Sequence, residues 1–296
     1  DEILTTPFTF VATTETIAIL GAIPVYVDID PKTFNMDINK IEAKITPKTK
    51  AIMPVHLYGQ PCDMDPLMKL AEKHGLYVIE DAAQAMGSKY NDKMICTIGD
   101  IGCISFYPSK NLGAFGDGGM LTTNDEKLAE KIRMIISHGS KKKYYHETLG
   151  VNSRLDSIQA AILDIKLKYL DEYCEARYNA AMKYNEKFKG IFETPYIMPG
   201  VKHIFHQYSI RVKNRDKMME FLKSNGIPSM IYYPVPLHMQ EAYKYDYKPG
   251  NYPVSEEIAK DIISLPMHTE LTDEEIDFIS SKVIELSLKS ELKTPF

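Results

Sequence analysis

Short apolar runs alternate with amphipathic segments through the first half of the chain. Runs of strand length lie at 23–28, 50–56, 76–80 and 101–107, and the spacing of apolar residues over 64–74 predicts a helix. Strands that alternate with helices predict βαβ units and a mostly parallel sheet, which is an α/β fold. Ligands of such sheets bind beyond the carboxyl ends of the strands, so functional side chains are expected there.

The second half of the chain predicts a different organisation. From Leu155 onward apolar residues recur at helical spacing, which predicts one long amphipathic helix over about 155–189. We expect this helix to bridge a large domain, 1–165, and a smaller C-terminal α+β domain, 166–296. The smaller domain is expected to contain a strand at 207–212, an extended segment at 226–233, and helices at 216–225, 255–263 and 273–288.

Composition and charge narrow the function classes. Hydrophobic residues make up 44% and charged residues 25% of the 296 residues, and the net charge is −5. These values give no electrostatic reason to expect nucleic acid or an anionic membrane as a partner, and no apolar run has the length of a membrane span. The four cysteines show no Cys-x-x-Cys spacing. We therefore expect free thiols in a reducing cytoplasm and no metal site.

One lysine is distinguished by its surroundings. Lys110 follows the apolar run 101–107 and precedes a glycine-rich loop. Partial burial there would lower the pKa of its ammonium group and free the amine for Schiff-base chemistry. An isolated lysine of this kind is otherwise most often exposed in a turn. Asp81, at the end of the run 76–80, favours the first interpretation, because a lysine and a carboxylate at one sheet edge are what pyridoxal phosphate requires.

Eight segments, in this order, resemble those of the DegT/DnrJ family of sugar aminotransferases, which are pyridoxal phosphate enzymes of fold type I. They extend over nearly the whole chain and read TTPFTFVAT (5–13), PVHLYGQP (54–61), EDAAQ (80–84), GDIG (99–102), FYPSKN (106–111), GDGG (116–119), GVNSRLD (150–156) and SLPM (264–267). The resemblance implies a large domain with a mostly parallel sheet and a smaller α+β domain. The family's phosphate-binding Gly-Thr/Ser turn belongs upstream of Asp1, so we expect the N-terminal portion of the large domain to be missing from this sequence.

The resemblance implies a role for several residues at the cofactor. Lys110 corresponds to the Schiff-base lysine and general acid/base, and Asp81 to the carboxylate that keeps the pyridine nitrogen protonated. The further cofactor contacts that it implies are Gln84 near the ring oxygen, Phe10 stacked on the ring, Ser105 on the phosphate, and Asn152 on the phosphate of the neighbouring subunit. It therefore implies a homodimer with shared active sites. A sugar 3-dehydratase of the family has histidine in place of this lysine, so that activity is not expected.

Several residues are candidates for contacts to the substrates, and each has an alternative structural role. Arg154 is a candidate to bind the α-carboxylate of the amino donor, and a salt bridge to Asp156 or another neighbour is the alternative. The other candidate substrate contacts, each equally compatible with a structural role, are Tyr107, His138, Tyr144, His146 and His238. Lysines 141–143 lie in the polar segment 137–153, which is either a solvated loop or a lid over a phosphorylated ligand.

The reaction that the resemblance implies is a ping-pong transamination. An amino group would pass from L-glutamate to a UDP- or dTDP-linked keto hexose in amino-sugar and polysaccharide biosynthesis, with the cofactor alternating between its pyridoxal (PLP) and pyridoxamine (PMP) phosphate forms. Segments 56–60 and 150–156 resemble members that aminate C3 more than members that act on a 4-keto-6-deoxy sugar, which is the alternative.

Two other classes of function can be weighed against an aminotransferase. A catalytically silent homologue could serve as a dimerisation or binding partner. Such homologues commonly lose the catalytic residues with perturbed pKa values, whereas this chain keeps Lys110 and Asp81. A nicotinamide-binding Rossmann domain is excluded, because no Gly-x-Gly-x-x-Gly turn follows a strand.

Overall fold

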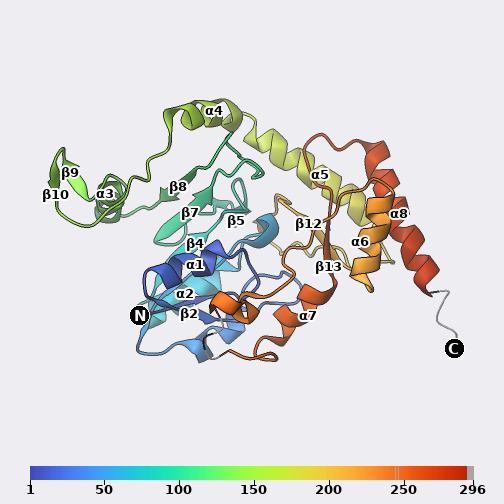
Figure 1. Ribbon diagram of the computed structural model, residues 1–296, viewed down its shortest axis with the longest axis horizontal. Helices are drawn as coiled ribbons and strands as arrows, with labels where there is room; N and C mark the ends of the chain where they lie inside the picture. The colour runs from blue at the N-terminus through green and yellow to red at the C-terminus, as the bar shows by residue number, and fades with distance from the viewer. Residues whose placement is uncertain (244, 246, 292–296) are drawn as a thin grey trace.

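The centre of the molecule is a six-stranded sheet (Figure 1). The computed structural model describes residues 1–243, 245 and 247–291. The strand order is β2-β1-β3-β4-β7-β8, and neighbouring strands are parallel except for the antiparallel pair β7 and β8. The strands are β1 (Glu2–Thr5), β2 (Ile23–Tyr26), β3 (Thr49–Ile52), β4 (Tyr77–Asp81), β7 (Ile101–Ser105) and β8 (Gly119–Thr122). The predicted mostly parallel α/β sheet is confirmed.

The helices that accompany this sheet begin and end at recognisable signals. They are α1 (Ala12–Ile19), α2 (Met64–His74) and α3 (Glu126–Ile135). Helix α2 has the predicted bounds. It is followed by Gly75, whose φ of 63° is a left-handed conformation that favours glycine. Helix α3 begins after Asp125, whose carboxylate accepts hydrogen bonds from the amides of Lys127 and Leu128 at 2.7 and 3.2 Å. The core beneath α2 includes Leu4, Ile52, Leu67, Ala71 and Val78.

The C-terminal half of the chain has a hydrophobic core of its own. Its elements are α5 (Leu170–Phe188), β12 (Tyr208–Arg211), α6 (Arg215–Ser224), β13 (Ile262–Leu265) and α8 (Asp273–Glu291). The ring of Tyr184 lies 5.9 Å from that of Phe188 and 4.8 Å from that of Tyr208, centroid to centroid. Helix α7 (Pro253–Asp261) instead packs against residues of the large sheet region, including Phe8 and Val55.

The predicted single helix over 155–189 is wrong. The chain forms α4 (Ser157–Leu167) and α5, and Tyr169 between them has φ −107° and ψ 4° (Figure 1). The helical spacing of apolar residues continues across this break, but the exposure of these residues changes from α4 to α5. Ile158 and Ile165 on α4 are 74% and 60% exposed, whereas Leu170 and Cys174 on α5 are buried. Spacing reports the face on which a residue lies and says nothing of a change in backbone angles at one position.

Two further predictions differ from the structure. Residues 262 and 263, expected to end a helix, begin strand β13, which pairs with β12 in antiparallel register. The segment 226–233 forms no named strand and has one isolated bridge, from Met230 to Ser264. The polar segment 137–153 contains a hairpin of β9 (Ser140–Lys142) and β10 (Tyr145–His146).

The remaining elements are short. They are β5 (Lys89–Tyr90), β6 (Lys93–Met94), β11 (Val201–Lys202) and the 3-10 helices η1 (Ile38–Lys40), η2 (Glu42–Lys44), η3 (Leu57–Gly59), η4 (Leu237–Met239) and η5 (Glu241–Tyr243). Among the described residues, no helix combines the length and apolar character needed to cross a membrane.

Candidate active site

Lys110 and Asp81 lie at the carboxyl ends of two neighbouring parallel strands. Asp81 is the last residue of β4 and pairs with Cys103 of β7, and Lys110 follows β7 in a turn closed by its own amide on the carbonyl of Tyr107 at 2.8 Å. The lysine is half-buried. Burial lowers the pKa of Lys110, and the charge of Asp81 acts in the opposite direction. The strand pairing and this electrostatic influence support the prediction that the two groups share one edge of the sheet.

The carboxylate of Asp81 is held by two donors. The hydroxyl of Thr13 on α1 donates to Oδ2 at 2.7 Å, and the amide of Ala83 donates to Oδ1 at 3.1 Å. The hydroxyl of Thr9 lies 3.2 Å from that of Thr13. These contacts fix the carboxylate at the sheet edge. Thr13 was not predicted as a site residue, because a threonine inside a helix gives no signal of a partner 68 positions away.

Gln84 and Phe10 are brought together by a tyrosine from the far end of the chain. The Oε1 atom of Gln84 accepts from the amide of Tyr58 at 2.8 Å, and its Nε2 atom donates to the hydroxyl of Tyr233 at 2.8 Å. The ring of Phe10 is 56% exposed and lies 6.3 Å from the ring of Tyr233. An exposed aromatic face beside these polar groups is available to a planar ligand. Tyr58 and Tyr233 were not predicted as site residues.

Ser105 is the last residue of β7, at the same carboxyl-end edge of the sheet as Asp81. Its hydroxyl accepts from the amide of Tyr107 at 3.3 Å, and Tyr107 is exposed. The loop that follows requires a glycine, since a Cβ atom on Gly113 would lie 2.4 Å from the carbonyl oxygen of Pro108. The loop therefore packs closely against the turn that carries Lys110.

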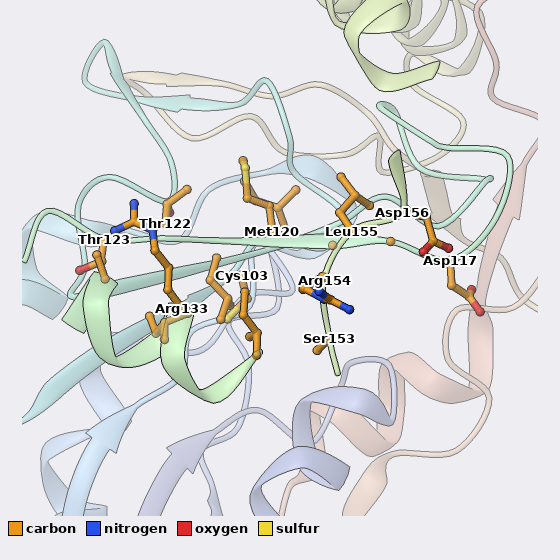
Figure 2. Close-up of a pocket in the computed structure, with 17 residues that line it drawn as sticks. Cys103, Asp117, Met120, Thr122, Thr123, Arg133, Ser153, Arg154, Leu155 and Asp156 are labelled. Atoms are coloured by element: carbon orange, nitrogen blue, oxygen red, sulfur yellow. The ribbon is translucent and has the colours of Figure 1, made fainter. Parts of the chain in front are cut away.

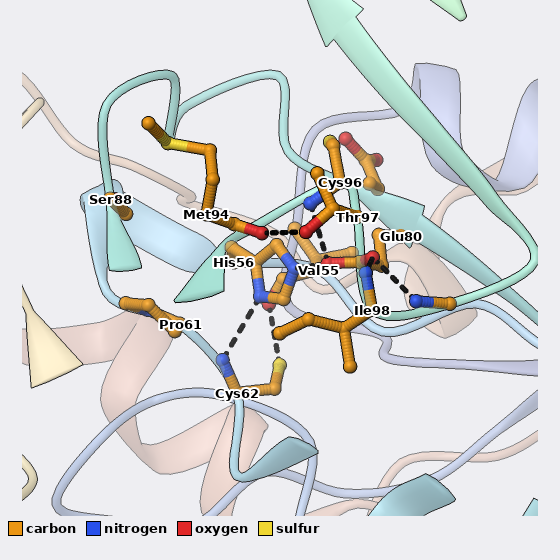
Figure 3. Close-up of polar contacts among 12 residues, drawn as sticks. Val55, His56, Pro61, Cys62, Glu80, Ser88, Met94, Cys96, Thr97 and Ile98 are labelled. Carbon is orange, nitrogen blue, oxygen red and sulfur yellow. Dashed lines mark hydrogen bonds and ion pairs between the residues drawn. The ribbon is translucent and has the colours of Figure 1, made fainter. Parts of the chain in front are cut away.

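Glu80 forms a buried network behind Asp81 (Figure 3). Its side chain has no exposed surface and accepts from the amides of Cys96 at 2.8 Å, Ile98 at 2.9 Å and Gly99 at 2.7 Å. These bonds fasten the turn before β7 to strand β4. Burial by itself would raise the pKa of Glu80, but the hydrogen bonds that it accepts outweigh burial and lower the pKa below its usual 4.5.

His56 completes this network from the end of the neighbouring strand (Figure 3). Its Nδ1 atom accepts from the amide of Cys62 at 3.0 Å, so Nε2 carries the proton and donates to Glu80 at 3.1 Å. The backbone amide of His56 donates to the carbonyl of Asp81 at 2.9 Å. His56 therefore supports the backbone of Asp81, and Glu80 holds the ring of His56 in place.

The predicted residues between 138 and 154 lie on the exposed segment that follows α3. His138, Tyr144, His146, Asn152 and Arg154 are exposed, and the segment with α3, β9 and β10 extends to one end of the molecule (Figure 1). Arg154 donates to the Oδ1 atom of Asn152 at 3.1 Å, and His146 Nδ1 lies 2.8 Å from the carbonyl oxygen of His138. His138, Tyr144 and His146 lie on or beside β9 and β10, away from the ends of β4 and β7, so these three are not brought to the Lys110 site within one chain (Figure 1).

Arg154 instead lines a cavity of about 920 Å³ beside the edge strand β8 (Figure 2). Its walls come from β8, α3 and segment 153–156, and it also contains Arg133 and Asp117. Neither Lys110 nor Asp81 lines this cavity.

His238 is buried, in place of the predicted contact with substrate. Its Nε2 atom lies 3.0 Å from Oε1 of Glu256, and its ring packs 4.7 Å from the ring of Tyr252 and 6.5 Å from that of Tyr26. Burial lowers the pKa of His238, which keeps the ring neutral in this aromatic cluster. Its proline-rich surroundings resembled a loop in sequence, but the aromatic neighbours that enclose it come from distant positions.

Three curated relatives are similar to this chain over most of their length. The Pleiotropic regulatory protein of Geobacillus stearothermophilus is 52% identical, over 96% of this chain and 78% of that protein. The UDP-N-acetyl-3-dehydro-alpha-D-glucosamine 3-aminotransferase of Acidithiobacillus ferrooxidans is 47% identical, over 96% and 77%. The UDP-2-acetamido-2-deoxy-3-oxo-D-glucuronate aminotransferase of Pseudomonas aeruginosa is 46% identical, over 94% and 77%.

Solved structures share the fold. A DegT DnrJ EryC1 StrS aminotransferase from Brucella abortus matches with a TM-score of 0.92 and 41% identity, over 97% of this chain and 79% of that one. The Streptococcus pneumoniae protein Spr1654 matches in its PMP form with a TM-score of 0.91 and 28% identity, over 98% and 82%. Its PLP form matches with a TM-score of 0.90 and 29% identity, over 98% and 81%.

The residues at the sheet edge fit pyridoxal phosphate. An amine with a lowered pKa, a carboxylate held by two donors and an exposed aromatic ring are available on neighbouring elements. The family model for the DegT/DnrJ/EryC1/StrS aminotransferases matches residues 1–284. This chain therefore belongs to the DegT/DnrJ/EryC1/StrS aminotransferase family, the pyridoxal phosphate-dependent sugar transaminases of fold type I.

Proposed function

We propose that this protein transfers an amino group from L-glutamate to C3 of a nucleotide-linked keto hexose, in the biosynthesis of an amino sugar for cell-surface polysaccharide. The observation that carries the chemistry is the half-buried Lys110, with its lowered pKa, in electrostatic reach of Asp81. The choice of C3 is supported by two relatives, whose names specify a 3-dehydro and a 3-oxo sugar.

Six residues would hold the cofactor. Lys110 would bind its aldehyde carbon, and Asp81 would accept a hydrogen bond from the protonated pyridine nitrogen. The others are Gln84 beside the ring oxygen, Phe10 on the ring face, Ser105 at the phosphate, and Asn152 reaching the phosphate of a neighbouring subunit. When bound, pyridoxal phosphate supplies an electron sink for the charge left at carbon when a proton departs.

Lys110 is the group that moves this proton. Because the pKa of Lys110 is lowered, a larger fraction of its amine is unprotonated near neutral pH, so Nζ can take the proton from the α-carbon of glutamate. In the second half-reaction the same Nζ atom would return a proton to the carbon that bears the new amine. Thr13 keeps the Oδ2 atom of Asp81 oriented through the 2.7 Å hydrogen bond.

The substrates would be bound by exposed polar residues. Arg154 is the proposed ligand of the donor carboxylate, by a bidentate guanidinium contact. Tyr107, His138, Tyr144 and His146 are the proposed contacts to the sugar nucleotide. His138, Tyr144 and His146 lie on or beside β9 and β10, away from the ends of β4 and β7 (Figure 1), so they would reach the site of a second subunit.

A homodimer with shared sites is part of the proposal. Large apolar side chains are exposed near the Lys110 loop and beyond it, among them Phe115 at 76%, Leu149 at 95% and Ile158 at 74%. A second copy that covers these side chains would remove apolar surface from water. Two inactive variants, Lys110→Ala and Asn152→Ala, should recover partial activity when their subunits are mixed, whereas unshared sites would give no recovery.

The substrate assignment is tested by amine transfer from glutamate to 3-keto and 4-keto hexoses linked to UDP and dTDP. We expect amination of a 3-keto compound by the parent and a loss of more than about 100-fold in Lys110→Ala, because a proton-transfer catalyst is removed. Product analysis by NMR identifies the aminated carbon. Amination at C4 alone would contradict the C3 assignment, and transfer by Lys110→Ala at the parent rate would contradict the mechanism.

A further inference from the structure

Another buried histidine contacts the residue that follows Lys110. His206 is 8% exposed, and its Nδ1 atom lies 2.9 Å from Oδ1 of Asn111, the residue that follows the lysine. An amide oxygen only accepts, so Nδ1 of His206 carries the proton and donates. The Nδ2 atom of Asn111 in turn lies 3.5 Å from the carbonyl oxygen of Ile204, at the edge of hydrogen-bonding distance. The side chain of Asn111 is thus held by the segment 204–206.

This segment is itself anchored on two sides. The amide of His206 donates to the carbonyl of Tyr58 at 2.8 Å. Its carbonyl oxygen accepts from Nη1 of Arg177 on α5 at 3.3 Å, and the same nitrogen also donates to the carbonyl of Met267 at 3.0 Å. The segment therefore has little freedom to move, and the imidazole provides a fixed point for Asn111.

Burial and two nearby positive charges favour the neutral form of His206. Burial, followed by the positive charges of Lys110 and Arg177, holds the pKa of His206 well below its usual 6.5. The other charged group that acts on Lys110 is Asp81, which lies at the end of β4. A neutral imidazole beside Asn111 adds no third positive charge to those of Lys110 and Arg177.

We propose that His206 is a positioning residue for Lys110: through its hydrogen bond to Asn111 it fixes the turn that carries the lysine and keeps the amine partly shielded from water. The catalytic benefit of holding Lys110 in this way rests on the proposed function, whereas the positioning itself does not. A merely structural histidine would stabilise the fold without affecting the amine, so the test follows the amine directly.

The experiment measures the reactivity of Lys110 as a function of pH in the full chain freed of cofactor. Acetic anhydride labels the unprotonated amine, and mass spectrometry of the peptide that contains Lys110 gives the midpoint. In His206→Leu we expect the midpoint to rise by about one pH unit toward that of an exposed lysine, because the loosened turn admits water. His206→Asn should retain the parent midpoint, because its amide nitrogen can replace Nδ1.

His203 offers a matched control in the same segment. It is also buried, and its Nδ1 atom accepts from the amide of Phe205 at 3.0 Å, with no hydrogen bond to Asn111 among the described residues. His203→Leu should leave the midpoint of Lys110 unchanged. An unchanged midpoint in His206→Leu, an equal rise in His203→Leu, or no rescue by His206→Asn would each overturn the proposal.

A second variant covers the case in which His206→Leu does not fold. His206→Gln keeps a polar side chain of similar size but moves its amide beyond the Nδ1 position, and the same rise is expected. Since the readout involves no substrate, it is independent of the aminotransferase activity itself. A failure of the proposed function would appear as unaltered transfer by Lys110→Ala, whatever His206 does.

Discussion

Removal of the buried carboxylate of Glu80 should destabilise the protein strongly. Glu80→Ala leaves two enclosed donors without a partner, the amide of Cys96 and Nε2 of His56, and two part-buried amides, those of Ile98 and Gly99. Each enclosed donor costs about 1–3 kcal/mol when it loses its acceptor. The expected loss in the free energy of unfolding is therefore roughly 3–5 kcal/mol, as for other broken buried pairs.

Urea denaturation at neutral pH measures this loss, and Glu42→Ala is the matched control. Glu42 also has two partners, Lys73 at 2.6 Å and His74 at 2.8 Å, but it lies on the surface. Exposed ion pairs contribute little to stability, so the control should unfold close to the parent. A loss below about 1 kcal/mol in Glu80→Ala would refute the reasoning, because it would mean that the buried donors find other partners.

The pH dependence of the same measurement has a defined sign. The pKa of Glu80 is lower in the folded state than its usual 4.5, so the unfolded chain binds its proton first. The stabilisation by Glu80 is fully present above the unfolded pKa and is lost as the pH falls through the folded pKa. The difference between the parent and Glu80→Ala should therefore shrink in that acidic range. A difference that grows on acidification would contradict the assignment of an ionised carboxylate.

Two further substitutions test the supports of the site. Thr13→Val removes the 2.7 Å donor of Asp81 and should weaken binding of pyridoxal phosphate by about 10–100-fold, since a bond to a charged group contributes about 1.5–3 kcal/mol, whereas Thr13→Ser should bind like the parent in a fluorescence titration. Gly59→Ala places a Cβ atom 2.7 Å from Cγ1 of Ile204 at a φ of 95°, and should lower the free energy of unfolding by at least about 1–3 kcal/mol. Gly190→Ala, at a φ of 77° with nothing within 4 Å, isolates the backbone contribution, and an equal loss there would contradict the steric argument.

Local signals explain which elements could be predicted. Helix α2 was predicted to the residue because Asp63 precedes it and Gly75 ends it. The break between α4 and α5 was not, because helical spacing continues through Tyr169. Strand β13 was not predicted either, because its pairing with Tyr208–Arg211 joins residues more than fifty positions apart and overrides the helical pattern before it.

The site shows the same division. Lys110 and Asp81 were predicted as neighbours because parallel strands present their ends at one edge. Tyr233 was not predicted, because its contact with Gln84 spans 149 positions, and His206 was not predicted for the same reason. The sequence indicates which reactive side chains follow the strands, whereas the residues that orient those side chains are brought in from distant positions by tertiary packing.

The most direct test of the account is to locate the amine that binds the cofactor. The protein is mixed with pyridoxal phosphate, reduced with borohydride and digested, and the modified peptide is identified by mass spectrometry. The account predicts a phosphopyridoxyl group on Lys110 in the parent and none at that position in Lys110→Arg. A parent protein modified at another lysine with Lys110 free, or not modified at all, would contradict it.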